Sequence, residues 1–465
     1  MKVYNTLSKK KEELSSIAPG KIGMYSCGPT VYNYAHIGNL RTYVFMDLLR
    51  RSLEHEGYKV KSVMNITDVG HLTSDADEGE DKMERASREQ KKTPYEIAEY
   101  YTSVFFHDIA ELNIKRPTIT PKATDHIQEM IAFVQGLLEK GFAYETGDGI
   151  YFDIQKFGHY GKLSGVNLEE QLAGARVEVN DEKRHPADFA LWKKAPKEHI
   201  MQWESPWGMG YPGWHIECSA MSRKYLGDQF DIHTGGVDHI PVHHENEIAQ
   251  SEAFLGHSAV NYWMHGEFMM VDNGKMSKSL GNTYTVEDLK NKGFEPLAFR
   301  YYCLNSHYRN KLNFTWEGMT AAQTSYTRLL EAALAHKHGK ETADEVMIHS
   351  MLSDFYAAVE DDLNVPKALG FTWLLAKQPK SAEVYRALLK MDEILGLSLD
   401  RCEEKCKSSQ EEEEILPDEI QALADQRAQA RMDKNWAQSD RLRDELSALG
   451  YIVLDSKEGQ KIKRK

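Results

Sequence analysis

The chain has few cysteines and no long apolar segment. Five cysteines in 465 residues, an odd number, indicate a reducing compartment rather than a framework of structural disulfides. No apolar run in the sequence approaches the roughly 20 residues of a membrane span. The stretch 1–20 is polar and does not have the pattern of a signal peptide. A cytoplasmic protein without membrane attachment is therefore expected.

Neither disorder nor a fibrous repeat fits the composition. Hydrophobic residues make up 41% of the chain and charged residues 28%, which is typical of a globular protein. The net charge of −14 argues against a surface dominated by nucleic-acid binding. It leaves room for one local basic face, because whole-chain charge describes solubility more than any single site.

The first 70 residues have the pattern of an α/β unit. Residues 23–27 form a short extended run that ends in Gly28-Pro29, a turn signal. Apolar residues then recur at helical spacing over 40–55, and residues 60–66 alternate as in a strand. A strand, a helix and a second strand predict a βαβ unit and hence a parallel, Rossmann-type sheet.

The composition changes from residue 143 onward. Residues 143–214 are rich in glycine and proline and contain short strand-like pieces, which indicates an insertion. An alternating α/β pattern returns over 215–300, and a mainly helical pattern follows after residue 310. Cys402 and Cys406 stand in an acidic stretch, where we expect a solvated pair in a linker. The expected divisions are 1–124 and 213–270 for the two halves of the Rossmann-type domain, 125–212 for the insertion, 271–314 for a connecting segment, 315–400 for a helical bundle, 401–417 for the linker and 418–465 for a small C-terminal module.

Residues 29–39, PTVYNYAHIGN, lie between the first expected strand and helix. At a helix N-terminus, free backbone N–H groups and the helix dipole attract phosphate, and His36 and Asn39 are placed to add side-chain donors. Gly38 would let a ligand approach the backbone. The alternative is a plain strand–helix turn with a buried histidine.

A second motif, KMSKS at 275–279, is bracketed by Gly274 and Gly281. Lys275 and Lys278 on such a loop are suited to clamp a polyphosphate and to move as it leaves. A solvated basic loop is the alternative. The two motifs stand in this order about 240 residues apart, and together they resemble the paired signature of class I aminoacyl-tRNA synthetases.

Possible metal ligands are spread along the chain. His243 and Glu247 are at i and i+4 of an expected helix, a spacing that puts both on one face, where they can bind one ion. Cys218 follows in GWHIEC, and Cys27 ends the first expected strand. Because the two cysteines are 191 residues apart, spacing alone does not define a zinc site. On spacing alone each cysteine is more simply a small buried hydrophobe.

The segments around these residues extend the resemblance. CGPTVY leading into HIG, then GWHIECSAM, HHENE and the lysine loop are similar to the cysteinyl-tRNA synthetase family over the first 310 residues. The resemblance implies one zinc ion per chain, held by four residues that map onto Cys27, Cys218, His243 and Glu247. A zinc-bound substrate thiol would separate cysteine from serine without an editing site. By the same resemblance the amino acid would be contacted by Thr67, Trp214 and His233.

The resemblance also implies the reaction. Cysteine would be ligated to tRNA(Cys) in two steps through a cysteinyl-adenylate, with ATP accompanied by Mg²⁺, on a monomeric enzyme. His36, Asn39, Lys275 and Lys278 would be catalytic, and His36, Gly38, Asn39 and Lys278 would bind ATP. The sequence departs from the family at three places: Asn39 replaces the second histidine of HIGH, His239 is an additional histidine, and VGHLT at 69–73 replaces a run that is often acidic in the family.

The C-terminal segment carries its own signal. Residues 419–465 hold ten Lys or Arg against eight Asp or Glu, a net +2. Residues 431–443, RMDKNWAQSDRLR, resemble the anticodon-binding segment of bacterial cysteinyl-tRNA synthetases. By that match Trp436 would stack on an anticodon base, while Arg431 and Asp440 would read base edges. The alternative is a small helical tail with Trp436 in its core.

Three other functions remain open. A cysteine ligase of mycothiol synthesis resembles the catalytic domain but lacks the C-terminal module. A non-catalytic tRNA-binding paralogue would be free to lose Lys278 and the metal ligands, which are present here. A NAD-linked dehydrogenase would need a G-x-G-x-x-G turn after the first strand, and this turn lacks it.

Overall fold

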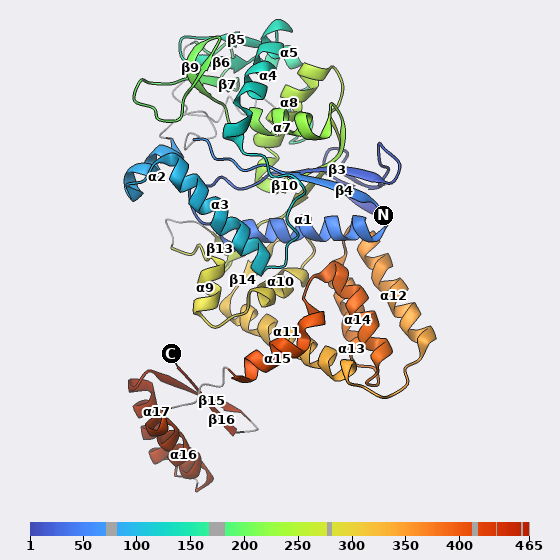
Figure 1. The fold of residues 1–465 in the computed structure, drawn as a ribbon, viewed down its shortest axis with the longest axis vertical. Coiled ribbons are helices and arrows are strands. Elements are labelled where there is room, and N and C mark those ends of the chain that lie inside the picture. Colours follow the sequence, from blue (N-terminus) through green and yellow to red (C-terminus); the bar gives the residue numbers. More distant parts are fainter. Residues whose placement is uncertain are drawn as a thin grey trace. The chain divides into compact units, whose positions relative to one another are not determined.

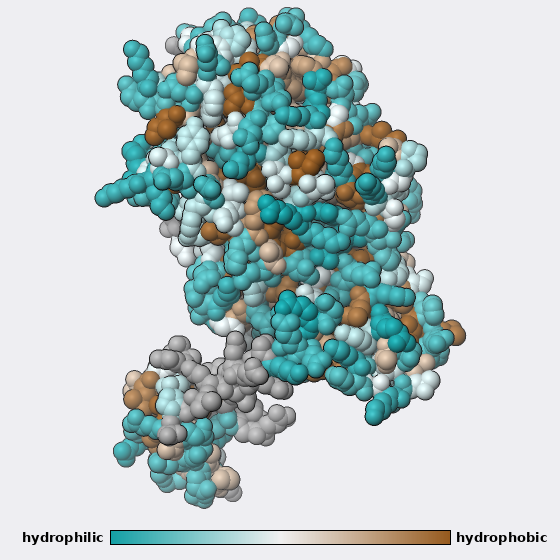
Figure 2. Space-filling view, viewed as in Figure 1, coloured by the Kyte–Doolittle hydropathy of each residue, from teal (hydrophilic) through white to brown (hydrophobic). Residues whose placement is uncertain are grey.

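The chain folds into two compact units, 1–400 and 401–465. The computed structural model describes residues 1–70, 81–166, 182–276, 281–411, 417–433, 435–456 and 459–464. In these ranges no helix is both long and apolar enough to cross a bilayer. The face shown in Figure 2 is mainly hydrophilic, with apolar side chains scattered over it.

A four-stranded parallel sheet forms the centre of the first unit. Its order is β11 (Val260–Gly266), β10 (Phe230–Gly236), β3 (Lys21–Ser26) and β4 (Lys59–Met64), and each neighbouring pair is parallel. Helix α1 (Ile37–His55) lies against one face and α7 (Ile216–Leu226) and α8 (His243–Leu255) lie on the other (Figure 1). The predicted Rossmann-type fold is confirmed.

Helix α1 connects β3 to β4 and begins three residues earlier than the apolar pattern predicted. His36 is its N-cap, and His36 and Asn39 form a reciprocal capping box that satisfies two backbone N–H groups. Leu40, Val44 and Leu48 recur along its buried face, as the helical period requires. The helix therefore starts at the motif that the sequence analysis assigned to phosphate.

The residues between the two halves of the parallel sheet form helices and a second, antiparallel sheet. Helices α2 (Lys82–Gln90), α3 (Pro94–Glu111) and α4 (Ile127–Glu139) come first along the chain. The short helix α5 (Ile154–Phe157) follows between the second and third strands of the antiparallel sheet. The order of this sheet is β5 (Ala143–Glu145), β6 (Gly149–Phe152), β7 (Phe189–Lys194), β9 (Gly208–Pro212) and β8 (Trp203–Ser205). One of the strand-like pieces expected in the insertion, at 176–179, lies outside the described residues. Phe152 and Trp192 of this sheet share one buried core with Cys218 and Ile248.

A small sheet carries the start of the lysine motif. Strands β12 (Met269–Val271) and β13 (Gly274–Lys275) form a hairpin, and β14 (Leu312–Phe314) pairs in parallel with β12. Asp272 and Asn273 both have positive φ, 47° and 61°, as a two-residue type I′ turn requires. The strands β1 (Lys2–Asn5) and β2 (Lys10–Glu13) form a separate N-terminal hairpin.

Helices complete the first unit: α9 (Val286–Asn291), α10 (Pro296–Leu304), α11 (Trp316–Lys337), α12 (Glu345–Glu360), α13 (Val365–Ala376) and α14 (Ala382–Leu395). A buried ionic group joins them to the sheet domain. Asp47 of α1 is 2.6 Å from Arg300 of α10 and 2.7 Å from Arg51. Two guanidinium groups hold the pKa of this buried carboxyl below its usual range, against the opposing effect of burial.

The second unit is a small α/β module. Helices α15 (Cys402–Glu411), α16 (Asp418–Met432) and α17 (Trp436–Ala448) are followed by the hairpin β15 (Tyr451–Ser456) and β16 (Gly459–Arg464). Ile420, Leu446 and Tyr451 form its core. Cys402 and Cys406 are buried in a helix, so the expectation of a solvated linker pair was wrong.

Candidate active site

Four potential metal ligands meet at the carboxyl edge of the parallel sheet. Cys27 directly follows β3, Cys218 lies in the first turn of α7, and His243 and Glu247 occupy the first two turns of α8. In parallel α/β sheets this edge is where ligands bind. None of the four residues is more than 5% exposed.

The four donor atoms all lie within 4.8 Å of one another. His243 Nε2 is 3.1 Å from Glu247 Oε1 and 3.6 Å from Cys218 Sγ, and Cys27 Sγ is 4.0 Å from Glu247 Oε1. Zinc bonds of about 2.0–2.3 Å in a tetrahedron separate ligand atoms by roughly 3.3–3.8 Å. Two sulfurs, one imidazole and one carboxylate at these separations fit a zinc ion and could bind a metal.

A second group of four overlaps the first. Cys27 and Glu247 belong to both, and the other two members are His233 and His244. His233 Nε2 lies 2.8 Å from Glu247 Oε2, and His244 Nε2 lies 3.1 Å from Cys27 Sγ. This group was missed by the sequence analysis as a metal-binding alternative, although the adjacent histidines 243 and 244 were the available signal.

Hydrogen bonds around the cluster orient its imidazoles. His243 Nδ1 is 2.9 Å from His215 Nδ1, and His244 Nδ1 is 2.7 Å from His265 Nε2. His265 Nδ1 in turn lies 2.8 Å from Thr6 Oγ1. Partners of this kind fix the tautomer and ring direction of a ligating histidine.

Charge and burial act in opposite directions within the cluster. Burial raises the pKa of the Cys27 thiol to about 11. Burial alone would raise the pKa of Glu247, but His233 and His243 outweigh it and hold that carboxyl well below its usual range. Burial alone would lower the pKa of His243, yet Cys218 and Glu247 raise it to about 10. These shifts keep Glu247 ionised beside two imidazoles, and a metal ion bound here would displace the protons of His243 and of the thiols.

The three residues assigned to the amino acid surround this cluster. Thr67 is buried, and its hydroxyl donates to Glu217 Oε2 at 2.8 Å. The Trp214 ring lies 5.0 Å from the His243 ring, centroid to centroid. His233 contacts Glu247 and stacks on Trp263 at 4.5 Å. The structure therefore brings Thr67, Trp214 and His233 to the region of the metal-ligand candidates.

Gly28 explains how the chain turns beside Cys27. A Cβ atom at this position would lie 1.6 Å from the carbonyl oxygen of Asn65, which belongs to the backbone just after β4. The Gly28 N–H also donates to Asn65 Oδ1 at 2.8 Å. Only glycine permits this close approach, which holds the end of β3, and hence Cys27, against the segment that carries Thr67.

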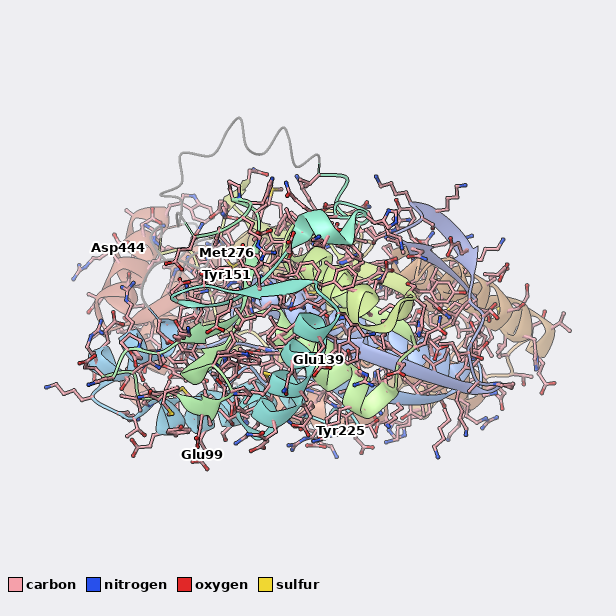
Figure 3. The ribbon with its side chains drawn as sticks, turned by 90° about the horizontal axis from the view of Figure 1, so that it is seen from above. Glu99, Glu139, Tyr151, Tyr225, Met276 and Asp444 are labelled. Carbon is pink, nitrogen blue, oxygen red and sulfur yellow. The ribbon has the colours of Figure 1, made fainter. Side chains whose placement is uncertain are left out.

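The two motifs that the sequence predicts to bind phosphate lie next to one another. The Ile37 N–H donates to Tyr284 O at 2.8 Å, and a Cβ on Gly38 would be 3.4 Å from Met276 Cε. Met276, labelled in Figure 3, is the last described residue before the gap at 277–280. Lys275 ends β13 and is exposed, whereas Lys278 lies outside the described residues.

The C-terminal candidates are on the surface of the second unit. Trp436 is the first residue of α17 and is 58% exposed, so the alternative that places it in the core is wrong. The Arg431 guanidinium lies 5.9 Å from its ring centroid. Asp440 forms an exposed ion pair with Arg443 at 3.0 Å.

The parallel sheet, its capped first helix and the hairpin that begins the lysine motif carry the two motifs that resemble class I aminoacyl-tRNA synthetases, and a family model shows that the chain belongs to that class. Residues 13–324 match the model of the tRNA synthetases class I (C) catalytic domain, and residues 414–462 match that of the cysteinyl-tRNA ligase anticodon binding domain. A solved methionyl-tRNA synthetase of Mycobacterium tuberculosis in complex with methionyl-adenylate shares the fold: the TM-score is 0.56 at 14% identity over 82% of this chain and 91% of that one.

Full-length relatives identify the particular family. The chain is 48% identical to a cysteine–tRNA ligase of Treponema denticola over 98% of both sequences. It is 46% identical to a cysteine–tRNA ligase of Thermus thermophilus, again over 98% of both. The chain belongs to the cysteine–tRNA ligase family.

Proposed function

We propose that this chain activates L-cysteine with ATP and transfers it to tRNA(Cys), with a zinc ion that selects the thiol. The observation that carries the proposal is the buried group of two thiols, one imidazole and one carboxylate within 4.8 Å. Cys27, Cys218, His243 and Glu247 would hold the ion. When bound, zinc supplies a soft Lewis acid that takes a thiolate in preference to a neutral hydroxyl.

We assign the first four-residue group rather than the second for a chemical reason. The set with Cys218 contains two thiolates and a carboxylate, whereas the set with His233 and His244 contains one thiolate and a carboxylate. Extra negative charge favours a divalent cation, and sulfur ligands favour zinc in particular. His233 then remains to contact the substrate, with Thr67 and with Trp214 as a wall of the pocket.

The phosphates of ATP, with Mg²⁺, would lie at the start of α1. His36, Gly38 and Asn39 offer side-chain donors and a close backbone approach at the positive end of the helix dipole. Lys275 and Lys278 would hold the leaving pyrophosphate while the cysteine carboxylate attacks the α-phosphate in line. Catalysis in this step is positioning and electrostatic stabilisation by the chain's own groups.

The second unit would bind the anticodon. Its support is the exposure of Trp436 and the cation beside it, because stacking on unpaired bases needs an uncovered aromatic face. Arg431 and Asp440 would read base edges. We keep the divisions given by the sequence analysis, except that residues 402–411 form helix α15 where a linker was expected, and we expect a cytoplasmic monomer.

Charging of a tRNA(Cys) transcript by the purified protein tests the proposal. Incorporation of radiolabelled cysteine, dependent on ATP, is the expected result. Cysteine-dependent ATP–pyrophosphate exchange without charging would instead favour a cysteine ligase of the mycothiol type, which joins cysteine to a small amine. Absence of both reactions from a zinc-containing preparation would leave only the non-catalytic paralogue.

Trp436→Ala is expected to lower kcat/KM for tRNA charging by about 10-fold or more, since base–aromatic stacking contributes about 1–3 kcal/mol. Cysteine-dependent pyrophosphate exchange should keep the wild-type rate, because that reaction needs no tRNA. Leu449→Ala, another exposed apolar residue of the same unit, is the matched control and should change neither assay. Equal losses in both assays for Trp436→Ala would point to a folding role.

A further inference from the structure

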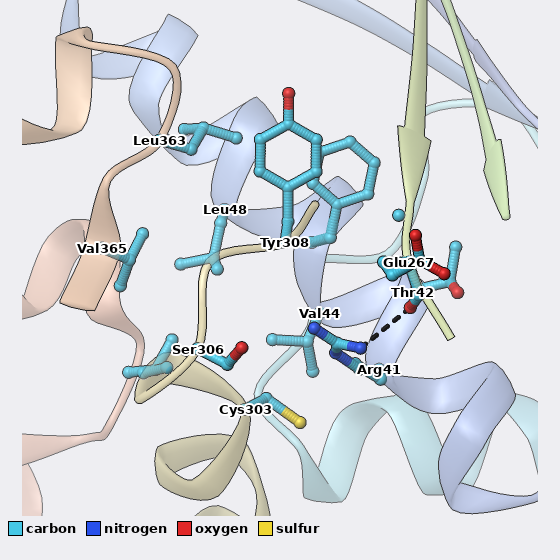
Figure 4. A pocket seen from close by; sticks show the side chains of 13 residues that line it. Arg41, Thr42, Val44, Leu48, Glu267, Cys303, Ser306, Tyr308, Leu363 and Val365 are labelled. Atoms are coloured by element: carbon cyan, nitrogen blue, oxygen red, sulfur yellow. Dashed lines mark hydrogen bonds between the residues drawn. The ribbon is translucent and has the colours of Figure 1, made fainter. Parts of the chain in front are cut away.

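Arg41 is a buried cation whose hydrogen bonds go to backbone carbonyls. It is only 5% exposed. Its Nη1 donates to Glu267 O at 2.9 Å and to Phe268 O at 2.6 Å, and its Nη2 donates to His307 O at 3.3 Å and to Asn310 O at 2.5 Å. Among the described residues no carboxylate forms a direct ion pair with Arg41, although the charge of Glu267 lies close enough to oppose the lowering of its guanidinium pKa by burial. Figure 4 shows the guanidinium beside Glu267 and Cys303.

Burying the Arg41 guanidinium costs free energy, which its hydrogen bonds to the chain must offset. Removing a guanidinium from water without a carboxylate partner costs several kcal/mol, which four charge-assisted hydrogen bonds must offset. The planar fork of arginine can bond two chain segments at once, whereas a lysine ammonium is a compact charge at a single point. The neighbouring cavity has a mixed lining, which includes Val44, Leu48 and Leu363 as well as Thr42, Glu267 and Ser306, so filling this space does not by itself require a charged side chain.

The four carbonyls belong to the base of the sheet that carries Lys275. Glu267 and Phe268 directly precede β12, and His307 and Asn310 lie in the loop that precedes β14. Phe268 O also accepts the Leu312 N–H at 3.1 Å, which begins the pairing of β12 with β14. Within the described residues β13 pairs with β12, and Asn282 Nδ2 donates to Lys275 O at 3.1 Å, so the position of Lys275 depends on that of β12.

Helix α1, which carries Arg41, begins at the turn that is proposed to bind the phosphates of ATP. Arg41 lies on α1 five residues after His36, the N-cap, and two residues after Asn39. One rigid helix therefore carries both the predicted ATP-binding side chains and the group that grips the β12–β14 sheet. The bond from Ile37 N to Tyr284 O ties the start of the same helix to the segment beyond the hairpin.

We propose that Arg41 is a positioning residue that fixes Lys275, through β12 and β13, relative to His36 and Asn39 at the triphosphate of ATP. The proposal rests on the proposed function, because it assigns Arg41 to the adenylation step. Arg41 itself does not touch the substrate. Arg41 keeps a constant distance between Lys275 and the side chains of His36 and Asn39, which are far apart in the sequence. A displacement of about 1 Å in groups that position a substrate can lower the rate by about 100-fold.

Arg41→Met is the informative substitution, because methionine is long, flexible and apolar and fills the same space without the hydrogen bonds. In cysteine-dependent ATP–pyrophosphate exchange we expect kcat to fall by roughly 10- to 100-fold. The rate is divided by the concentration of cysteine-binding sites, which calorimetric titration measures. Unfolded protein binds no cysteine and therefore does not affect the kcat obtained. KM for cysteine and the zinc content should stay within about twofold of wild type, since the thiol pocket is held by other residues. Arg41→Lys should recover part of the lost rate.

Arg309→Gln is the matched control. Arg309 also holds the 307–310 loop, but its guanidinium bonds the Asp362 carboxylate at 2.6 Å and 2.9 Å rather than any carbonyl before β12. This variant should lower the melting temperature yet keep the wild-type kcat per site. An Arg41→Met enzyme with wild-type kcat per site would overturn the inference, as would an equal loss of kcat in Arg309→Gln. A wild-type protein without exchange activity would contradict the proposed function instead.

Discussion

Replacing Cys218 by serine is expected to remove the zinc ion and with it the recognition of cysteine. A serine hydroxyl is a poor zinc ligand compared with a thiolate, and loss of partners outside the ligand shell already weakens metal affinity by about 10- to 100-fold. We expect KM for cysteine in pyrophosphate exchange to rise by at least about 1000-fold. Metal content after dialysis, measured by mass spectrometry, should fall from about one zinc per chain toward zero.

The two overlapping ligand groups make a sharper version of this experiment possible. His243→Gln should lose the metal in the same way, because His243 belongs only to the group with Cys218. His244→Gln is the matched control, being adjacent, equally buried and part of the other group. It should keep the metal, with an affinity lowered by no more than about 10- to 100-fold through the lost contact with Cys27. Retention of zinc and of cysteine affinity in Cys218→Ser would exclude selection of the thiol by a metal held at Cys218.

Wild-type protein is expected to prefer cysteine over serine by about 10⁴-fold or more in kcat/KM. A site built to bind one group strongly rejects the analogue that lacks it, and no editing site is then needed. The measurement is pyrophosphate exchange with each amino acid in parallel. 2-Aminobutyrate, which has the size of cysteine but a methyl group in place of the thiol, serves as the control for shape.

Selection of the thiol by zinc predicts two further results in the same assay. If zinc selects the thiol, 2-aminobutyrate should be rejected as strongly as serine, whereas a pocket that selects by shape would accept it. Removal of zinc with a chelator should abolish activation of cysteine and leave the slow rate with serine unchanged. Cysteine activation that survives chelation, with the metal shown to be absent, would refute the assignment.

Part of this structure follows from sequence periodicity. The βαβ unit was predictable because apolar spacing changes from two to 3.6 residues between 23 and 66. His243 and Glu247 were predictable as a pair, since i and i+4 share a helix face whatever the fold. Cys27 and Cys218 could not be paired by spacing, because what brings them together is the adjacency of β3 and β10 and the packing of α7 across them.

Other features carry no sequence signal at all. The carbonyl partners of Arg41 are backbone atoms, which every residue has, so no motif indicates them. Residues 459–464 contain one apolar residue, and their pairing with β15 was missed for that reason. Cys402 and Cys406 were expected to be solvated because their neighbours are charged, but a helix buries one face even when the other is acidic.

The strand order also constrains how the chain is made. Strand β3 lies between β4 and β10, and about 210 residues separate the end of β3 at Ser26 from the end of its partner β10 at Gly236. At a synthesis rate of about 5–20 residues per second, one edge of β3 waits roughly 10–40 s on the ribosome for its partner. Cys27 leaves the exit tunnel long before Cys218 and His243. The metal site is thus assembled late in translation, and nascent chains stalled before residue 243 should not retain zinc.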